Sequence, residues 1–390
     1  MTKKITILGS TGSIGQSTLD LVRRAGADAF EVIALTANSN VDDLVTQTHE
    51  FRPRFIALAD VTRGDALRAR LSGVDVQIGI GPEAVVEAAR IRSDFTMAAI
   101  VGAAGLPPTL AAVEQGIHIG LANKECLVCA GELFMHSVRR HGAMLLPVDS
   151  EHNAIFQVLE RNKPKAVKRF ILTASGGPFW QKSLADLRSV SCTDALNHPV
   201  WSMGARISVD SATLMNKGFE LIEAHYLFDR ASEEIDIIVH PQSIVHSMVE
   251  YIDGSVLAQM GTPDMRIPIA YALCWPERME APVQQLNLAE VSQLTFFEPD
   301  LARFPALKHA RTAMETGGFA PNILNAADEV AVTAFIGESI KFLQIEEVIS
   351  RTLEICMSQF PADHDPMVLA DVIAVDEQAR QTAGKVIASL

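Results

Sequence analysis

The sequence predicts an α/β protein with three parts. A Rossmann-like parallel sheet comes first, an α+β domain follows, and a helical bundle ends the chain. Short apolar strands alternate with amphipathic helices in the first part, strand patterns dominate the second, and the third shows helical periodicity alone. We place these parts at residues 1–148, 149–274 and 305–390, with a linker at 275–304.

The first part begins with a predicted βαβ unit. Ile5–Leu8 is an apolar strand, Gln16–Arg24 an amphipathic helix and Val32–Leu35 a second buried strand. The alternation then continues, which predicts a parallel sheet with helices on both faces. The further strands and helices are expected at 55–59, 65–71, 82–91, 97–101, 107–115, 117–122 and 143–148.

In the second part, strand patterns replace the regular alternation of strands and helices. The Asp-Gly pair within 252–255 favours a hairpin turn, and the strands around it predict a mostly antiparallel sheet. Ser175–Met203 has weak periodicity and is expected to be a long loop with one short helix; loops of this length are usually lids or disordered segments. Strands are expected at 169–173, 235–239, 245–250 and 256–260, and the helices of the third part at 305–315, 322–336, 343–357 and 367–387.

Composition excludes several classes of protein. The net charge of −14 argues against a general nucleic-acid binder, which needs a basic surface. No apolar run approaches the roughly 20 residues that span a bilayer, and MTKKITILGS enters a strand without a signal-peptide core. Five cysteines in so long a chain do not indicate a disulfide framework. We expect a cytoplasmic protein that binds neither nucleic acid nor membranes.

A glycine-rich turn joins the first strand to the first helix. Its glycines, Gly9, Gly12 and Gly15, permit a tight turn that brings backbone N–H groups to a pyrophosphate. The spacing is GxxGxxG rather than GxGxxG, and its place between strand and helix favours dinucleotide binding over a purely structural turn.

The end of the second strand indicates which dinucleotide binds. NAD enzymes usually place a carboxylate there to hold the ribose 2′-hydroxyl. This chain has Asn38-Ser39-Asn40 instead, so no carboxylate repels a 2′-phosphate, and NADP is favoured over NAD. A cation for that phosphate is missing from these three positions.

Three carboxylates form a candidate metal site. Asp149 and Glu151 follow a strand end, and in an extended chain their side chains would point the same way. Glu220 lies on a helix whose polar face also holds Asn216 and Glu223. Oxygen ligands without a Cys or His pair indicate Mg²⁺ or Mn²⁺. The alternative is that these acids, and that helix face, are simply solvated.

Several donors suit a phosphate monoester. Ser175 begins a Ser-Gly-Gly-Pro turn after a strand, and Lys124 ends another strand, where α/β sheets place ligand contacts. Trp201, in the long loop, is either a core anchor or part of a lid. Alone, each polar residue would more often be a helix cap or a solvated side chain. The other donors are His198, Ser211, Asn216 and Lys217.

Other signals carry less weight. Cys126 and Cys129 form a CxxC pair, but no second pair exists for zinc, so we expect ordinary buried cysteines. His225, His240 and His246 lie in apolar runs and are expected to be core histidines.

Long motifs resemble one known family. Among them are GSTGSIGQSTLD, LANKECLV, LLPVDSEHNAIFQ, LTASGGPF and HPVWSMGARISVDSATLMNKGFELIEA, and together they resemble the 1-deoxy-D-xylulose-5-phosphate reductoisomerases. The match is colinear from residue 5 to about 270. The resemblance implies an NADPH-dependent enzyme that needs Mg²⁺, Mn²⁺ or Co²⁺, with a catalytic middle domain. It would rearrange and reduce 1-deoxy-D-xylulose 5-phosphate to 2-C-methyl-D-erythritol 4-phosphate, in the non-mevalonate route to isoprenoids.

The resemblance also implies residue roles and a homodimer paired through the middle domain. Metal ligands would be Asp149, Glu151 and Glu220. The expected proton-transfer or oxyanion-stabilising groups are Lys124 and Glu151. Substrate contacts would be Lys124, Ser150, Glu151, Ser175, His198, Ser211, Asn216, Lys217 and Glu220, with Trp201 on a closing loop. Cofactor contacts would be Thr11, Gly12, Ser13, Ile14, Asn40, Asn123, Glu125 and Gly204, beside Asn38 and Ser39.

The sequence differs from the family pattern at one place, and two other functions are considered. Many members have Gly-Lys-Asn where this chain has Asn38-Ser39-Asn40, so one contact to the 2′-phosphate is in doubt. A reductase resembling aspartate-semialdehyde dehydrogenase would need a nucleophilic cysteine, and no cysteine here has that context. A non-catalytic NADP-binding protein would not need three clustered carboxylates.

Overall fold

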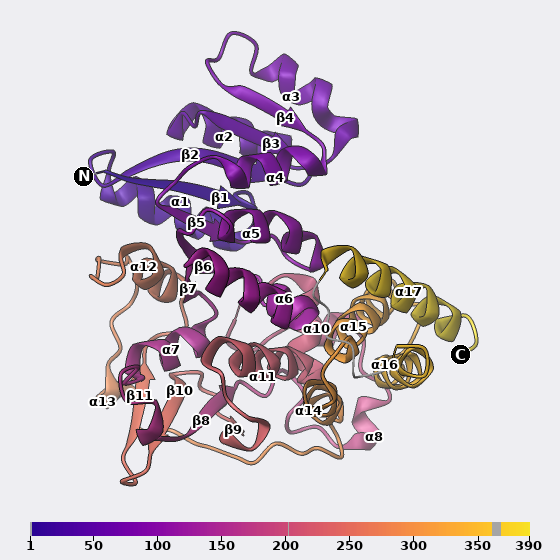
Figure 1. The fold of residues 1–390 in the computed structure, drawn as a ribbon. Coiled ribbons are helices and arrows are strands. Elements are labelled where there is room, and N and C mark those ends of the chain that lie inside the picture. The colour runs from indigo at the N-terminus through magenta and orange to yellow at the C-terminus, as the bar shows by residue number, and fades with distance from the viewer. Residues whose placement is uncertain (1, 202, 361–367) are drawn as a thin grey trace. The chain divides into compact units, whose positions relative to one another are not determined.

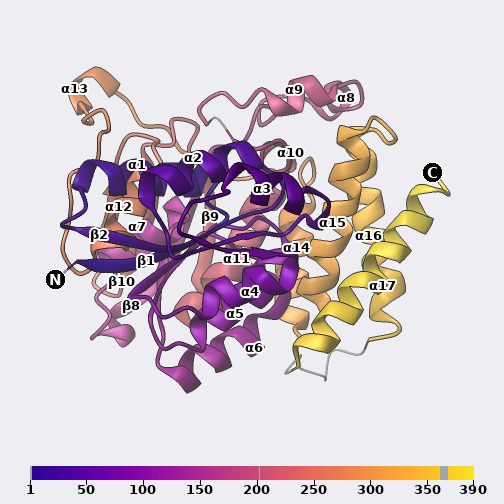
Figure 2. The same cartoon turned by 90° about the horizontal axis from the view of Figure 1, so that it is seen from above.

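The N-terminal sheet is parallel throughout, in the strand order β4-β3-β2-β1-β5-β6-β7. The computed structural model describes residues 2–201, 203–360 and 368–390. Figures 1 and 2 show helices on both faces of the sheet, with α1 and α2 on one and α4 and α5 on the other. The strands are β1 (Lys3–Leu8), β2 (Phe30–Ala37), β3 (Phe55–Leu58), β4 (Gln77–Ile80), β5 (Phe95–Ala98), β6 (His118–Leu121) and β7 (Met144–Pro147).

The helices around this sheet confirm the predicted alternation of strand and helix. They are α1 (Ser13–Ala25), α2 (Val41–Phe51), α3 (Gly64–Arg70), α4 (Pro82–Arg90), α5 (Leu106–Val113), α6 (Glu125–His141) and α7 (Ser150–Val158). The sequence patterns did not predict β4, α2, α6 or α7. Strand β4 is partly exposed along its length, so it lacks a buried apolar run. Helix α2 begins with the polar residues Asp42 and Asp43, and its start is marked only by the cap Asn40.

One later helix packs on this sheet unit. Helix α12 (Arg266–Cys274) contacts α1, and Arg266 lies 3.7 Å from Asp20 on that helix. Lys3 at the start of β1 donates to the backbone oxygen of Leu273 at 2.6 Å. The first compact unit of the chain therefore comprises residues 1–126, 134–153 and 264–284.

The second unit comprises residues 127–133, 154–263 and 285–390. Its sheet has the order β11-β10-β8-β9, in which β10 is antiparallel to both neighbours while β8 and β9 are parallel. This confirms the predicted mostly antiparallel sheet, and the predicted hairpin joins β10 to β11. The strands are β8 (Val167–Ala174), β9 (Ile235–Val239), β10 (Val245–Tyr251) and β11 (Val256–Met260).

The helices of the second unit share one apolar core with this sheet. Phe170 from β8, Phe219 from α11 and Leu324 from α15 are all within it and fully or almost fully buried. Figure 2 shows α15, α16 and α17 side by side, as the predicted bundle requires. The main helices are α10 (Ala205–Thr213), α11 (Met215–Phe228), α14 (Ala306–Thr316), α15 (Ala320–Ile336), α16 (Phe342–Met357) and α17 (Leu369–Ile387).

Two details differ from expectation. The described part of the predicted long loop contains two short helices, α8 (Leu184–Leu187) and α9 (Cys192–Leu196), each with a Ser-x-x-Asp capping box that the periodicity did not reveal. Another short helix, α13 (Leu288–Val291), lies in the predicted linker. Residue 367, where the last helix was expected to begin, lies outside the described residues. None of the helices that the structure describes is long and apolar enough to cross a membrane.

Candidate active site

The glycine-rich turn lies between β1 and α1, as predicted. Gly9 has a φ of 83°, and a Cβ there would lie 2.7 Å from the backbone oxygen of Ala99, so only glycine fits. Helix α1 begins at Ser13, with Gly12 as its N-cap and no side-chain cap. Thr11 to Ile14 therefore lie at a helix N-terminus that has no side-chain cap, which is a favourable place for a phosphate.

In the segment after β2, one of the three predicted cofactor residues caps the next helix. Asn40 caps α2, because its Oδ1 accepts from the backbone N–H of Asp43 at 3.1 Å and its Nδ2 donates to the Asp43 carboxylate at 2.8 Å. Asn38 and Asn40 are exposed, and Ser39 is half-buried. The structure thus adds a capping role for Asn40.

The carboxyl ends of β6 and β7 bring Lys124 and Asp149 together. These strands are paired neighbours, so residues that follow them lie at the same edge of the sheet. Lys124 Nζ lies 2.6 Å from Asp149 Oδ2, and the two side chains are 14% and 15% exposed. Burial raises the pKa of Asp149, but the Lys124 ammonium and His152 outweigh it and hold that pKa well below its usual range.

Asn123 and Glu125 shape the loop after β5. Asn123 is buried and donates to the backbone oxygen of Gly102 at 2.9 Å, while its own oxygen accepts from the N–H of Cys126. Glu125 accepts from the N–H of Gly102 at 3.1 Å. Both predicted cofactor residues therefore support a second loop at the carboxyl edge of the sheet.

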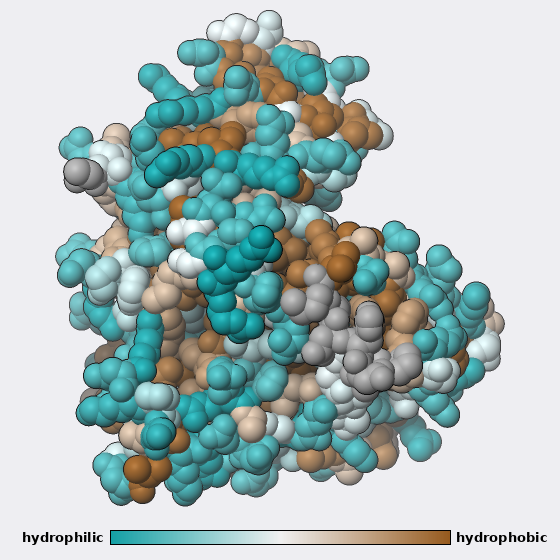
Figure 3. All heavy atoms as spheres, viewed as in Figure 1, coloured by the Kyte–Doolittle hydropathy of each residue, from teal (hydrophilic) through white to brown (hydrophobic). Residues whose placement is uncertain are grey.

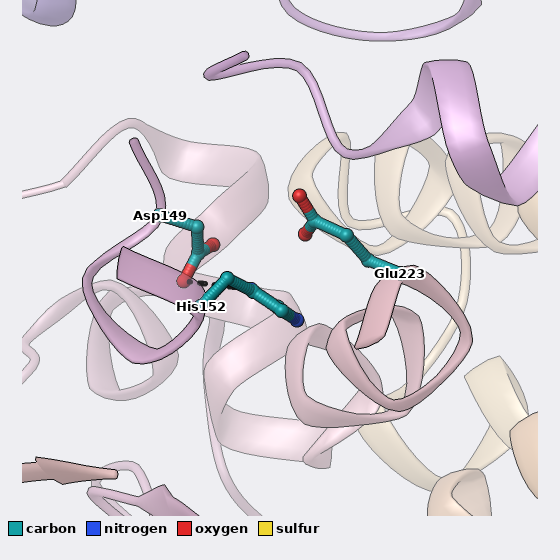
Figure 4. A group of neighbouring side chains, drawn as sticks. All are labelled: Asp149, His152 and Glu223. Atoms are coloured by element: carbon teal, nitrogen blue, oxygen red, sulfur yellow. Dashed lines mark ion pairs between the residues drawn. The ribbon is translucent and has the colours of Figure 1, made fainter. Parts of the chain in front are cut away.

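The assumed geometry at Asp149 was wrong. Ser150 and Glu151 are not extended, because they form the first turn of α7, where the Ser150 hydroxyl donates to the Glu151 carboxylate. Asp149 instead lies beside His152, with 3.6 Å between Asp149 Oδ1 and His152 Nδ1 (Figure 4). His152 was not among the predicted site residues, although the spacing Asp-x-x-His places both side chains on one face of a helix.

Ser175 and His198 meet in the second unit. Ser175 follows β8, and its Oγ lies 2.9 Å from His198 Nε2. The backbone N–H groups of Val200 and Trp201 donate to His198 Nδ1 at 3.2 and 2.9 Å. Because Nδ1 accepts, Nε2 carries the proton of the neutral ring and donates to Ser175. Burial lowers the pKa of His198, which favours that neutral form.

Trp201 packs against a histidine of the sheet. Its ring centre is 6.2 Å from that of His246 on β10. His246 is buried, as expected, and burial, assisted by the charge on Lys217, lowers its pKa to about 4. The half-buried Trp201 is thus anchored by a neutral ring.

The corner between α10 and α11 gathers four predicted residues. Leu214, with a φ of 65°, ends one helix and starts the next. Ser211 precedes this corner and is 8% exposed. On α11, Asn216 donates to Glu220 Oε1 at 2.6 Å, and Lys217 forms an ion pair with the same carboxylate. Asn216, Lys217 and Glu220 lie within about one helical turn of each other.

This polar helix face is buried. Lys217, Glu220 and Glu223 are 3%, 1% and 1% exposed, so the alternative of a solvated face was wrong for them. Charged groups are buried only where partners or a ligand compensate for lost water. Gly204, the remaining predicted cofactor residue, is the exposed N-cap of α10.

Comparison with known proteins identifies the family. Profiles described as "1-deoxy-D-xylulose 5-phosphate reductoisomerase" and as two C-terminal domains of that enzyme match residues 5–131, 145–228 and 260–382. The Zymomonas mobilis enzyme of this name is 50% identical over 388 residues, covering 100% of this chain and 98% of its own. The Rhodospirillum centenum enzyme is 52% identical over 387 residues, covering 99% and 95%.

The chain belongs to the 1-deoxy-D-xylulose 5-phosphate reductoisomerase family. The structure of the Zymomonas mobilis reductoisomerase in complex with NADPH matches with a TM-score of 0.93 at 48% identity, over 100% of both chains. A reductoisomerase in complex with NADPH, fosmidomycin and magnesium also gives a TM-score of 0.93, at 43% identity over 99% and 98% of the two chains. These likenesses exclude both rival functions and confirm the predicted fold class.

Proposed function

We propose that the residues described above form the active site in which this reductoisomerase converts 1-deoxy-D-xylulose 5-phosphate into 2-C-methyl-D-erythritol 4-phosphate. NADPH and a divalent metal ion are its cofactors. The observation that carries the assignment of the site is the cluster of the half-buried Asn216 with the buried Lys217 and Glu220 on α11, because burying these charges is costly unless partners or a ligand compensate for the lost water.

Asp149, Glu151 and Glu220 are the proposed metal ligands. All three offer carboxylate oxygens, which suits Mg²⁺. The fit is supported by Asp149 Oδ1, a buried oxygen with no hydrogen-bond partner among the described residues. When bound, the ion polarises the substrate carbonyl and stabilises negative charge on its oxygen.

Lys124 is the proposed partner of the reacting oxygens. Its ammonium lies at the sheet edge against Asp149, so it is oriented before the substrate arrives. From there it would stabilise a developing oxyanion or transfer a proton, with Glu151 as the second proton-transfer group. Holding these groups in place matters because the carbon skeleton is cleaved and rejoined, and fragments must not escape.

The substrate phosphate is proposed to bind among neutral donors and one ammonium. Ser175, Ser211 and Asn216 offer hydroxyl and amide protons, His198 offers its Nε2 proton, and Lys217 offers positive charge. Ser150 would bind a substrate hydroxyl. Binding energy at this remote phosphate orients the reacting carbons, and Trp201 is proposed to exclude water once its loop closes.

NADPH is proposed to bind along the glycine-rich turn. Its pyrophosphate would lie at Thr11, Gly12, Ser13 and Ile14, where the N-terminus of α1 attracts negative charge. The 2′-phosphate would lie beside Asn38, Ser39 and Asn40, none of which carries a carboxylate. The other proposed contacts are Asn123, Glu125 and Gly204.

A homodimer formed through the second unit is the proposed assembly. Strand β11 is the edge of its sheet, and Val256 and Leu257 on it are 47% and 44% exposed. Ile252, on the turn before it, is 70% exposed, and Figure 3 shows hydrophobic residues at the lower left of its view, over the β10–β11 hairpin. An apolar edge strand is a template for pairing with another chain, and a second copy covers it. We keep a cytoplasmic location as a prediction, which the five free cysteines support.

The test is an assay of NADPH oxidation. Oxidation should require both 1-deoxy-D-xylulose 5-phosphate and a divalent ion, and EDTA should abolish it. Glu220→Gln should remove most turnover while NADPH binding, followed by fluorescence, stays within about twofold of wild type. Glu234→Gln, at a partly exposed ion pair, is the control. Undiminished turnover by Glu220→Gln, or activity that survives EDTA, would contradict the metal assignment.

A further inference from the structure

A network of charged side chains joins α10 to two helices of the C-terminal bundle. Arg206 on α10 donates to Glu329 Oε1 at 2.6 Å and to Asn325 Oδ1 at 3.0 Å, both on α15. Arg380 on α17 donates to the other oxygen of Glu329 at 2.6 Å. Two guanidinium groups thus meet on one carboxylate, and α10 is tied to α15 and α17.

Asp328 is the unusual member of this network. It is fully buried, and neither of its carboxyl oxygens has a hydrogen-bond partner that donates to it among the described residues. An ionised carboxylate there would be a buried charge without a donor, which is strongly unfavourable. Its neighbour is the carboxyl group of Asp210 on α10, itself 3% exposed.

Of the four carboxyl groups in this network, Asp328 is the one that forms no ion pair with Arg206 or Arg380 among the described residues. Arg206 forms an ion pair with Glu329, and its Nε lies 3.6 Å from Asp210 Oδ2. Arg380 forms ion pairs with Glu329 and Asp376. Burial, and then the carboxylate of Asp210, raise the pKa of Asp328 well above its usual range, although Arg206 opposes this. On the other helices of the bundle, His309 pairs with Glu346 and Arg351 with Glu347.

Asp210 immediately precedes Ser211, and α10 then passes through Leu214 into α11. We propose that Asp328 keeps its proton and donates it in a hydrogen bond to Asp210, and that this bond positions α10, and with it Ser211, for the substrate phosphate. This inference rests on the proposed role of Ser211. Asp328 is a positioning residue, because it acts on the substrate only through α10.

The test compares two substitutions of Asp328. Asp328→Asn keeps the shape and an N–H donor toward Asp210, whereas Asp328→Ala removes the donor. Asp328→Ala should raise the KM for 1-deoxy-D-xylulose 5-phosphate at least tenfold, with NADPH affinity within twofold of wild type. Asp328→Asn should restore that KM to within about threefold of wild type. A wild-type KM in Asp328→Ala, or equal damage in both variants, overturns the proposal.

Two controls separate this role from general destabilisation and from the proposed site. Val348→Ala removes buried volume from α16 and should lower the melting temperature without changing either KM. Ser211→Ala tests the phosphate contact directly. If Ser211→Ala binds substrate normally, the proposed site fails at that residue. If it binds poorly while Asp328→Ala binds normally, only the positioning role fails.

Infrared spectroscopy tests the proton itself. At neutral pH, the spectrum of wild-type protein minus that of Asp328→Asn should contain the carbonyl band of a protonated carboxylic acid. A difference spectrum with only carboxylate bands would show that Asp328 is ionised and would overturn the proposal.

Discussion

Lys124 Nζ lies 2.6 Å from Asp149 Oδ2, at the carboxyl ends of two paired strands. Lys124→Ala should lower kcat by about 10²- to 10⁴-fold, the usual contribution of a positioned proton-transfer or oxyanion-stabilising group. Steady-state kinetics at saturating metal would measure this. Lys168→Gln, which breaks an ion pair of a lysine that is 57% exposed, should leave kcat unchanged. Equal effects of both substitutions would contradict a specific role for Lys124.

Ser39→Lys should strengthen NADPH binding. The segment Asn38-Ser39-Asn40 lacks a cation, and a lysine there would add a charged donor to the 2′-phosphate. We expect the Kd for NADPH to fall about 5- to 10-fold, as one charge-assisted hydrogen bond allows. Calorimetry with NADPH and NADH would measure it. An equal gain for NADH, which lacks the phosphate, would show that the lysine acts elsewhere.

His246 should make the protein less stable in acid. Its pKa is about 4 in the fold against 6.5 for a free side chain, so between those values the unfolded chain binds a proton that the folded protein does not. Stability from this group is complete above pH 6.5 and falls as the pH drops toward 4, by about 3 kcal/mol at most. Urea unfolding at several pH values would measure the loss. His246→Asn should show a shallower decline, and an identical decline would assign the effect to other groups.

Leu257→Arg should disrupt the proposed homodimer. Leu257 is 44% exposed on edge strand β11, and a charge there would be buried against a second copy. Sedimentation velocity should show a shift from dimer to monomer at micromolar concentration. Val61→Arg, which places the same charge at an apolar residue that is 64% exposed in the other unit, is the control. Wild-type protein that sediments as a monomer would refute the dimer.

The sequence revealed the features that depend on local pattern. The glycine-rich turn was recognisable because its glycines follow a strand and lead into a helix, and the structure places Gly9 and Gly12 between β1 and α1 and Gly15 in the first turn of α1. The long motif on α10 and α11 identified the family. Burial of Lys217 and Glu220 was not recognisable, because helical periodicity describes which residues share a face and not what covers that face.

Other features of the structure could not be predicted from the sequence. Some depend on contacts between distant segments, and others on whether a short segment forms a helix or a strand, which residue propensities do not decide. Ser150 and Glu151 begin a helix rather than extend a strand, so the predicted route to convergence with Asp149 was wrong. The proximity of Asp210 to Asp328 depends on two helices far apart in the sequence. Neither residue stands out by its type or spacing, so only the tertiary structure reveals them.

The contacts of α12 with β1 and α1 have a consequence for synthesis. Lys3 and Asp20 are made early, but their partners Leu273 and Arg266 leave the ribosome much later. The nucleotide-binding unit therefore cannot complete its folding as soon as its own strands have emerged; it must wait while most of the second unit is translated. A protein fragment that ends at residue 148 would lack α12, so the part of α1 that packs against α12 would be exposed to solvent.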